Sequence, residues 1–270
     1  MKLRGIGKSD PGVKRKVNED SFLVAPELGL YVIADGMGGH KGGEVASRMV
    51  VETLSEYWEK VRGGFSPVIP SSITQDVSEP GKHLIHSITI CNQVIREHQK
   101  KAAYRRMGST VSALLQEKDA LWIADVGDSP VFLFDRGHLI RISEEHSIEA
   151  EQFAMGMSEP PGATNPFLKN ILTRVLGLSE KVNVYVNSIR PDPGDFILLC
   201  SDGLTKSIPI SSIKTILDDF SISLQRKVEI LIDEAKRGGG EDNITLILLE
   251  VMEEGRWVRF KGRLKKKGLL

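Results

Sequence analysis

YVIADGMGGHKGGEVAS, residues 31–47, is the stretch from which the rest of this chain can be interpreted. Its apolar beginning, Tyr31 to Ala34, has the short length and partly β-branched content of a buried strand, and it ends at Asp35. Five glycines in residues 36–43 then permit backbone conformations that a Cβ would forbid. From Gly43 onward, apolar residues recur at helical spacing. The stretch therefore predicts a strand that delivers a carboxylate to a loop, and a helix that leaves the loop.

The combination of an apolar run and an acidic turn occurs three more times. The turns hold Asp128, Asp202 and Asp242, and the neighbouring runs are 121–126, 196–200 and 244–249. One Asp-Gly pair alone is a common turn. Four acidic turns beside four strands, however, would gather carboxylates at one edge of the sheets. There the carboxylates would repel one another unless cations neutralised them.

Composition favours one globular domain. The 270 residues are 40% apolar and 27% charged, and the acidic turns between Asp35 and Asp242 must come together to act. The formal net charge is zero, so no nucleic-acid partner is expected. Residues 255–270 carry seven basic and no acidic side chains, which leaves about seven net negative charges on residues 1–254.

The cysteines and the N-terminus indicate the compartment. Cys91 and Cys200 are the only cysteines, and each lies in an apolar pattern, as buried thiols of a reducing compartment do. The N-terminal residues 1–10 lack the apolar core of a signal peptide, and no apolar run approaches the length of a transmembrane helix. We therefore predict a cytoplasmic protein, without a transmembrane segment and monomeric.

Short polar turns separate several of the predicted strands. Strands 108–115 and 120–126 flank one such turn, and strands 131–134 and 138–142 flank another. Strands joined in this way pair antiparallel, which argues against a doubly wound parallel sheet. Further strands are expected at 21–24, 182–188, 196–200 and 245–251, and helices at 43–57, 84–95, 211–220 and 223–237.

Two segments lack a sustained period. Residues 62–81 are rich in Ser, Pro and Gly and are predicted to be a flexible connection. Residues 143–170 are predicted to be an irregular flap with a short helix near 148–153. His83, His86 and His98 lie in the second predicted helix without a spacing that suits a metal, so we expect partly exposed helical histidines.

The acidic turns suit a metal-assisted attack on phosphorus. Carboxylate oxygens without suitably spaced Cys or His select Mg²⁺ or Mn²⁺. Two such ions bridged by one carboxylate could activate a water for in-line attack. An arginine would bind the phosphate oxygens, and Arg15 is the basic residue nearest to Glu19 and Asp20. A nucleotide-binding loop is the rival explanation, but neither GxGxxG nor GxxxxGK[ST] fits residues 36–43.

With these residues assembled, residues 5–252 resemble the metal-dependent protein serine/threonine phosphatases of the protein phosphatase 2C (PPM) type, in their bacterial-like branch. Seven motifs occur in the order of that family. They are Arg15 with NED (18–20), ADGMGGH with GEVAS (34–47), MGST (107–110), VGDS (126–129), LTRVLG (172–177), CSDGL (200–204) and GGGEDNIT (238–245).

The resemblance implies an α+β fold in which two packed antiparallel β-sheets form a sandwich, flanked on both faces by α-helices in four αββα layers. It also implies a catalytic domain over residues 1–252 and a basic tail over residues 253–270. The implied activity is hydrolysis of phosphoserine and phosphothreonine in proteins. Water activated at a binuclear Mg²⁺ or Mn²⁺ centre would attack, and no covalent phosphoenzyme would form.

The central metal ligands are also assigned only by the resemblance. Asp35 would bridge two ions. The Gly36 carbonyl would bind one of them, and Asp202 and Asp242 would bind the other.

The remaining roles follow from the same resemblance. Glu19 and Asp20 would hold waters around the ions, and Asp128 with Asp202 would form a third, weaker metal position. Arg15 would bind the substrate phosphate, and residues 143–170 would lie beside the site as the variable flap.

Three positions depart from the family pattern. Met37 stands where one branch has a histidine, which leaves the acid that protonates the leaving group unassigned. Ser109 replaces the usual threonine and keeps its hydroxyl. Pro130 stands where an arginine commonly follows Gly-Asp-Ser, so the contacts of that arginine are missing here, although Asp128 itself is intact.

Two other functions remain open at this stage. One is a non-catalytic sensor that keeps the fold, and the other is a phosphoesterase for small molecules. Expected partners of the phosphatase are phosphorylated proteins and a cognate serine/threonine kinase. The basic tail, with Trp257, Phe260 and Leu264 at helical spacing, is either a helix that contacts a partner or a membrane surface, or a solvated end of the chain.

Overall fold

The computed structural model describes residues 1–38, 42–73, 77–101, 106–157 and 171–253. Most of the basic tail, the second half of the flap and two residues of the ADGMGGH motif lie outside this description.

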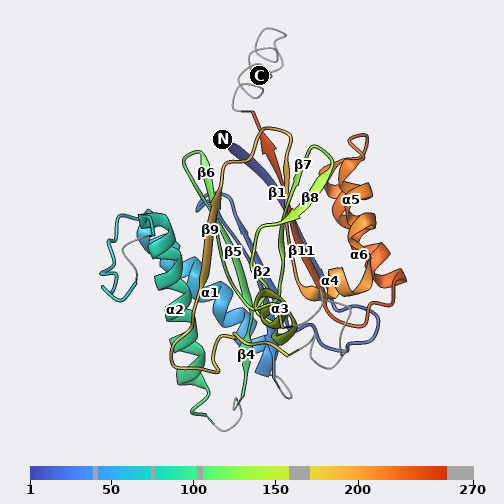
Figure 1. Ribbon diagram of the computed structural model, residues 1–270. Coiled ribbons are helices and arrows are strands. Elements are labelled where there is room, and N and C mark those ends of the chain that lie inside the picture. The colour runs from blue at the N-terminus through green and yellow to red at the C-terminus, as the bar shows by residue number, and fades with distance from the viewer. Residues whose placement is uncertain (39–41, 74–76, 102–105, 158–170, 254–270) are drawn as a thin grey trace.

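Two antiparallel sheets form the centre of the molecule (Figure 1). One sheet has the order β1-β11-β10-β7-β8, and the other has the order β2-β3-β5-β6-β9 with β4 beside β3. The strands of the first sheet are β1 (Lys2–Asp10), β7 (Val131–Asp135), β8 (His138–Arg141), β10 (Phe196–Cys200) and β11 (Ile244–Met252). Those of the second are β2 (Asp20–Ala25), β3 (Leu30–Met37), β4 (Gly108–Ser109), β5 (Val111–Glu117), β6 (Ala120–Val126) and β9 (Tyr185–Ile189).

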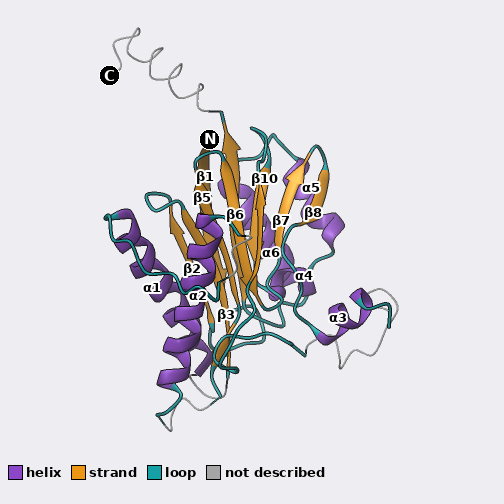
Figure 2. Ribbon diagram, turned by 60° about the vertical axis from the view of Figure 1, so that its left-hand side comes forward, coloured by secondary structure: helices purple, strands orange, loops and turns teal. Residues whose placement is uncertain are grey.

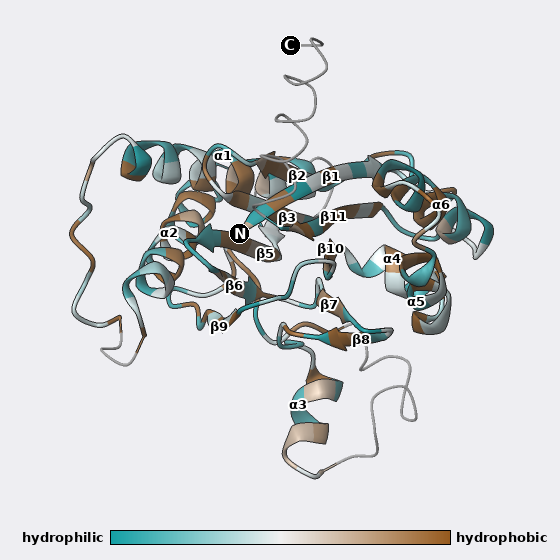
Figure 3. Cartoon of the chain, turned by 90° about the horizontal axis from the view of Figure 1, so that it is seen from above, coloured by the Kyte–Doolittle hydropathy of each residue, from teal (hydrophilic) through white to brown (hydrophobic). Residues whose placement is uncertain are grey.

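Helices cover both outer faces of the sandwich. Helices α1 (Gly42–Arg62) and α2 (Glu79–His98) pack on the second sheet, whereas α4 (Asp202–Ser207), α5 (Ile210–Asp218) and α6 (Leu224–Arg237) pack on the first. Seen from above, the two helical layers lie on opposite sides of the strands (Figure 3). Helix α3 (Ile148–Ala154) stands apart from the layers (Figure 2). The predicted four-layer αββα sandwich is confirmed.

The strand that opened the sequence analysis is buried on both faces. Tyr31 and Ile33 pack in the core between the sheets, together with Ile197 and Ile247. Val32 and Ala34 alternate with them and face the core beneath α1 and α2. A strand between two cores reads as a continuous apolar run, which explains why no polar residue interrupts β3 before Asp35.

The structure corrects two expectations about local structure. The turn after β10 is the first turn of helix α4, because Ser201 takes an extended N-cap conformation and Asp202 begins the helix. The single strand expected over 108–115 is divided into β4 and β5 at Thr110. Both differences place backbone groups at the acidic edge of the sandwich.

Two expectations about the cysteines and histidines agree with the structure. Cys91 and Cys200 are buried free thiols, and burial raises the pKa of each thiol. His83, His86 and His98 are partly buried residues of α2. Among the described residues, no helix combines the length and the apolar character that crossing a bilayer requires.

One buried lysine supports the end of helix α5. Lys227 is 1% exposed, and its Nζ donates hydrogen bonds to the carbonyls of Ile216 (2.8 Å), Leu217 (2.8 Å) and Asp219 (2.7 Å). The last carbonyls of a helix have no partner within the helix, so the ammonium of α6 satisfies those of α5. The contact joins the two helices of this outer layer.

Replacing Lys227 with Met should keep the packing of the stem and remove the donor. We expect the free energy of unfolding to fall by about 1–3 kcal/mol, because buried carbonyls lose their hydrogen bonds. Urea denaturation of the variant measures this, with Lys214→Met on the exposed face of α5 as the control. A stability equal to or above that of the wild type would show that desolvation of the ammonium outweighs its hydrogen bonds.

Candidate active site

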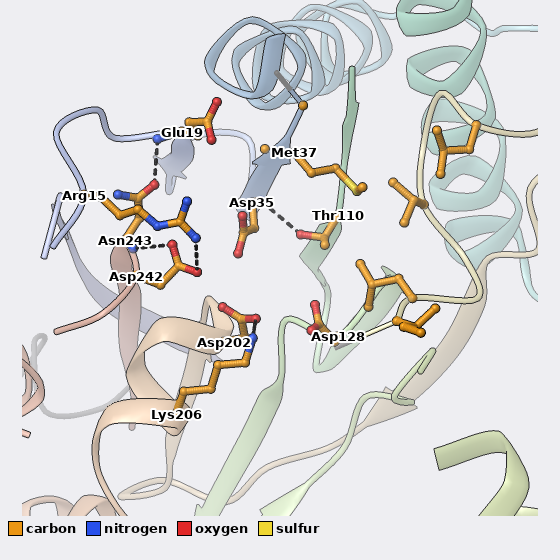
Figure 4. A pocket seen from close by; sticks show the side chains of 16 residues that line it. Arg15, Glu19, Asp35, Met37, Thr110, Asp128, Asp202, Lys206, Asp242 and Asn243 are labelled. Atoms are coloured by element: carbon orange, nitrogen blue, oxygen red, sulfur yellow. Dashed lines mark hydrogen bonds and ion pairs between the residues drawn. The ribbon is translucent and has the colours of Figure 1, made fainter. Parts of the chain in front are cut away.

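A pocket of about 490 Å³ opens at one edge of the sandwich. Side chains from several segments point into it (Figure 4). Its acidic lining residues come from the loop before β2, the end of β3, the loop after β6, the start of α4 and the loop before β11. The lining residues predicted from the sequence are Arg15, Glu19, Asp35, Gly36, Asp128, Asp202 and Asp242.

Asp35 is fixed by the strands around it. Its backbone N–H donates to Thr110 Oγ1 (3.0 Å), and the Thr110 N–H donates to the Asp35 carbonyl (2.8 Å). On the other side, Asp35 pairs in register with Asp20 of β2. Asp20 is 8% exposed and accepts a hydrogen bond from Ser201 Oγ at 2.8 Å. Asp20, the one predicted site residue that is not part of the pocket lining, thus lies next to that lining, between the two sheets.

Gly36 occupies a position with no room for a side chain. A Cβ there would lie 2.1 Å from the Gly43 carbonyl oxygen and 2.5 Å from that of Glu19. The close approach brings the start of α1 and the segment before β2 to the carboxyl end of β3. This is the structural reason for the glycine directly after Asp35.

The pKa values of the clustered carboxyls are raised. Burial is the largest cause and neighbouring carboxylates add to it, so the pKa of Asp35 lies well above its ordinary value. The pKa of Asp20 rises to about 6 for the same reasons. That of Asp128 rises to about 7 through burial and the charge of Asp202. Ionising the whole cluster is therefore costly unless positive charge compensates.

Two side-chain cations supply part of that charge. Arg15 forms an ion pair with Asp242 (3.0 Å), rather than with Glu19 or Asp20, which are nearer in sequence. Lys206, one helical turn after Asp202, forms an ion pair with that carboxylate. Burial is the largest single cause and lowers the pKa of Lys206, but the charge and hydrogen bond of Asp202, together with the charges of Asp128 and Asp242, raise the pKa above its ordinary value.

The residues fit divalent cations of the hard type. Asp20 Oδ1 and Asp202 Oδ1 are buried and accept no hydrogen bond from any residue that the structure describes. Carboxylate and carbonyl oxygens are the ligands that Mg²⁺ and Mn²⁺ prefer. Within the described ranges, however, no three His, Cys, Asp or Glu side chains are already arranged to hold one ion. Because Arg15 and Lys206 engage two of the carboxylates, binding requires side-chain rotation.

The sequence analysis gave no role to several supporting residues, although they lie in the motifs it quoted. Asn243 accepts a hydrogen bond from the Glu19 N–H (2.8 Å) and donates to the Pro11 and Val17 carbonyls, both at 3.0 Å. It thereby ties the segment before β2 to β11. Thr110 and Ser201 are also supporting residues, because their hydroxyl groups form hydrogen bonds with Asp35 and Asp20. Lys206 lies four residues after Asp202, a spacing that brings two side chains together on a helix. This spacing is informative only once helix α4 is known.

The loop that holds Asp128, next to Pro130, is contacted by side chains from other segments. Arg141, at the end of β8, donates to the Asp128 carbonyl at 3.3 Å. On the same loop, the Gly127 N–H donates to Nδ1 of the buried His146 at 3.0 Å. Burial and then Arg174 lower the pKa of His146 to about 4, so the ring is neutral and can accept this bond. The Asp128 loop is therefore held from the base of the flap.

Comparisons with known proteins agree with this geometry. The sequence model of the family described as Protein phosphatase 2C matches residues 13–233. A Listeria welshimeri protein named serine/threonine phosphatase stp is 34% identical over 255 residues, covering 92% of this chain and 97% of its own.

Solved structures give the same result for the fold. The Mycobacterium tuberculosis serine/threonine phosphatase PstP/Ppp is similar with a TM-score of 0.81 and 27% identity, over 94% of this chain and 100% of that one. A catalytic domain of PstP described as a complex with 2 manganese ions has a TM-score of 0.76 and 28% identity, over 93% of this chain and 99% of that one.

The raised pKa values predict how stability depends on pH in EDTA. Between the ordinary pKa of aspartate and the folded values of about 6 and 7, the folded state keeps protons that the unfolded chain has released. The contribution of these carboxyls is therefore fully present at low pH and is lost as the pH rises through the folded values. Thermal unfolding should show this loss between about pH 4 and pH 7, and Mn²⁺ should restore stability at pH 8.

Asp128→Asn is the matched variant for this measurement, because it removes one titrating carboxyl and leaves the histidines unchanged. Its loss of stability in EDTA should be smaller than that of the wild type. An identical pH dependence of the two proteins would contradict the assignment.

Proposed function

Because the chain belongs to the protein phosphatase 2C family and is a protein serine/threonine phosphatase, we propose that it hydrolyses phosphoserine and phosphothreonine by direct attack of water, without a covalent phosphoenzyme. The observation that carries the proposal is the gathering of Asp35, Asp128, Asp202 and Asp242 in one pocket with Arg15. Acidic oxygens and a guanidinium in one pocket can bind cations and a phosphate together.

We propose that Mg²⁺ or Mn²⁺ is required. When bound, the ions would lower the pKa of a water and offset the charge that develops at phosphorus. Asp35 would lie between two ions, with the Gly36 carbonyl on one and Asp202 and Asp242 on the other. The manganese complex of the similar PstP domain supports metal dependence.

The surrounding residues would complete the site. Glu19 and Asp20 would accept hydrogen bonds from waters around the ions, and Asp128 with Asp202 would hold a third, weaker cation. Arg15 is half exposed at the pocket, and its fork can donate two hydrogen bonds to a phosphoryl group. Binding of cations near Asp242 would free this guanidinium from its present ion pair.

We further propose a monomeric, cytoplasmic enzyme that acts on phosphoproteins and opposes a cognate serine/threonine kinase. Residues 1–252 would form the catalytic domain and residues 253–270 a basic tail outside it. The tail would either contact a partner or an anionic membrane surface, or be a solvated end of the chain.

Asp35→Asn and Asp202→Asn should each lower turnover of a phosphothreonine peptide by at least about 10³-fold, more than the loss of a single stabilising hydrogen bond would. Circular dichroism should show that both variants remain folded. The control is Asp233→Asn on the exposed face of α6, which should keep its activity. Activity like that of the wild type in either of the first two variants would contradict the metal assignment.

Arg15→Ala should raise the KM for the same peptide about tenfold, because a charge-assisted hydrogen bond to phosphate is lost. The affinity for Mn²⁺, measured by calorimetry, should change little. The matched control is Lys14→Ala, which removes the exposed cation directly before Arg15. An unchanged KM in Arg15→Ala would exclude a role in binding phosphate.

A further inference from the structure

One side of the active-site pocket is apolar. Five of its lining residues have large apolar side chains, and we call them the apolar wall: Met37, Ile171, Leu172, Val175 and Leu178. Figure 4 shows the Met37 side chain on the side of the pocket away from Arg15 and Asp242. The pocket thus has a charged side and an apolar side.

Three of the five residues of the apolar wall are exposed, whereas Val175 is buried at 5% exposure. Met37 is 38% exposed, Ile171 is 46% exposed and Leu178 is 54% exposed. Single exposed apolar residues are common on proteins, but a contiguous group with a polar rim marks an interaction surface. Here the rim is the carboxylate cluster itself, so the two surfaces are continuous within one cavity.

The segment 171–178 is held in place from outside the pocket. The Gly177 N–H donates to Oδ1 of the fully buried Asn92 on α2 (2.7 Å), and Gln99 Nε2 donates to the Gly177 carbonyl (2.9 Å). Leu176 and Ser109 exchange backbone hydrogen bonds of 3.0 and 3.2 Å. These contacts fix the segment to α2 and to β4, the neighbour of β3.

The residues between the wall positions face elsewhere. Thr173 Oγ1 donates to Glu151 of α3 (2.7 Å), and its N–H donates to the His146 carbonyl (2.9 Å). Thr173 therefore binds the base of the flap, while the apolar residues on either side of it line the pocket. Because these contacts already order segment 171–178, a ligand that binds the wall does not have to order it, and no conformational entropy is lost for that purpose.

The charge distribution identifies what the apolar wall can bind. A phosphoryl group must lie on the charged side, because moving its charge to an apolar surface without partners is costly. A pocket of about 490 Å³ is within the range that holds a drug-sized ligand, so a second side chain can enter with the phosphorylated one. In a protein substrate, that second side chain comes from a neighbouring residue of the same peptide.

We propose that the apolar wall selects substrates with an aliphatic residue directly beside the phosphorylated serine or threonine. The inference rests on the proposed function and adds a sequence preference to it. Acidic neighbours are disfavoured, because the wall borders the carboxylates and offers them no donor.

The test uses two pairs of phosphothreonine peptides. In one pair the residue directly before the phosphothreonine is Leu or Asn, and in the other pair the residue directly after it is Leu or Asn. Leu and Asn have side chains of similar shape, so the members of each pair differ mainly in polarity. With Mn²⁺, the wild type should cleave the Leu peptide with a kcat/KM about tenfold higher at one of the two positions, as burial of one aliphatic side chain predicts. In Leu178→Ser and Ile171→Ser, the ratio of kcat/KM for the Leu peptide to kcat/KM for the Asn peptide should fall towards one. Ile210→Ser, an exposed apolar position on α5 that is 43% exposed, should keep the ratio.

The outcomes separate the two proposals. Equal kcat/KM for Leu and Asn at both positions would overturn the inference and leave the proposed function intact. A preference for Leu that survives in both wall variants would also overturn it, because the preference would arise elsewhere. Failure of the wild type to hydrolyse any of the peptides would overturn the proposed function together with the inference.

Discussion

Repulsion among buried carboxylates is the constraint on which the rest of this structure depends. Asp20, Asp35 and Asp128 have raised pKa values because burial and their neighbours both oppose ionisation. A protein gains nothing for stability from such a cluster. The sandwich must therefore hold the cluster against repulsion, and cations must complete it.

The two sheets provide the rigidity that this requires. Asp20 and Asp35 are cross-strand partners in one sheet, while Asp202 and Asp242 lie at the ends of β10 and β11 in the other. Ser201 Oγ joins the sheets by its hydrogen bond to Asp20 (2.8 Å). Because side chains on packed strands move little, the carboxylates are confined to a small volume. The ion pairs of Arg15 with Asp242 and of Lys206 with Asp202 offset part of their charge.

Much of this could be predicted from the sequence, for identifiable reasons. The short turns between strands predicted antiparallel pairing, the acidic turns predicted a carboxylate cluster, and the seven motifs, through the family that they resemble, predicted the sandwich and the residues that line the pocket. Helix α4 was missed because Asp-Gly also begins turns, and so the spacing of Lys206 from Asp202 carried no signal. The contact of Arg141 with the Asp128 loop joins residues 13 apart, and only the paired strands bring them together. Likewise, Ile171 and Leu178 look like ordinary core residues until the structure shows them exposed in the pocket.

The central claim is that the carboxylate cluster is a site for divalent cations, and calorimetric titration with Mn²⁺ tests it most directly. The wild-type chain should bind at least two ions, and Asp35→Asn should lose most of this binding because its carboxylate lies among all the others. Binding should weaken as the pH falls from 8 to 6 and the carboxyls gain protons. No binding by the wild type, or equal binding by the wild type and Asp35→Asn, would contradict the account.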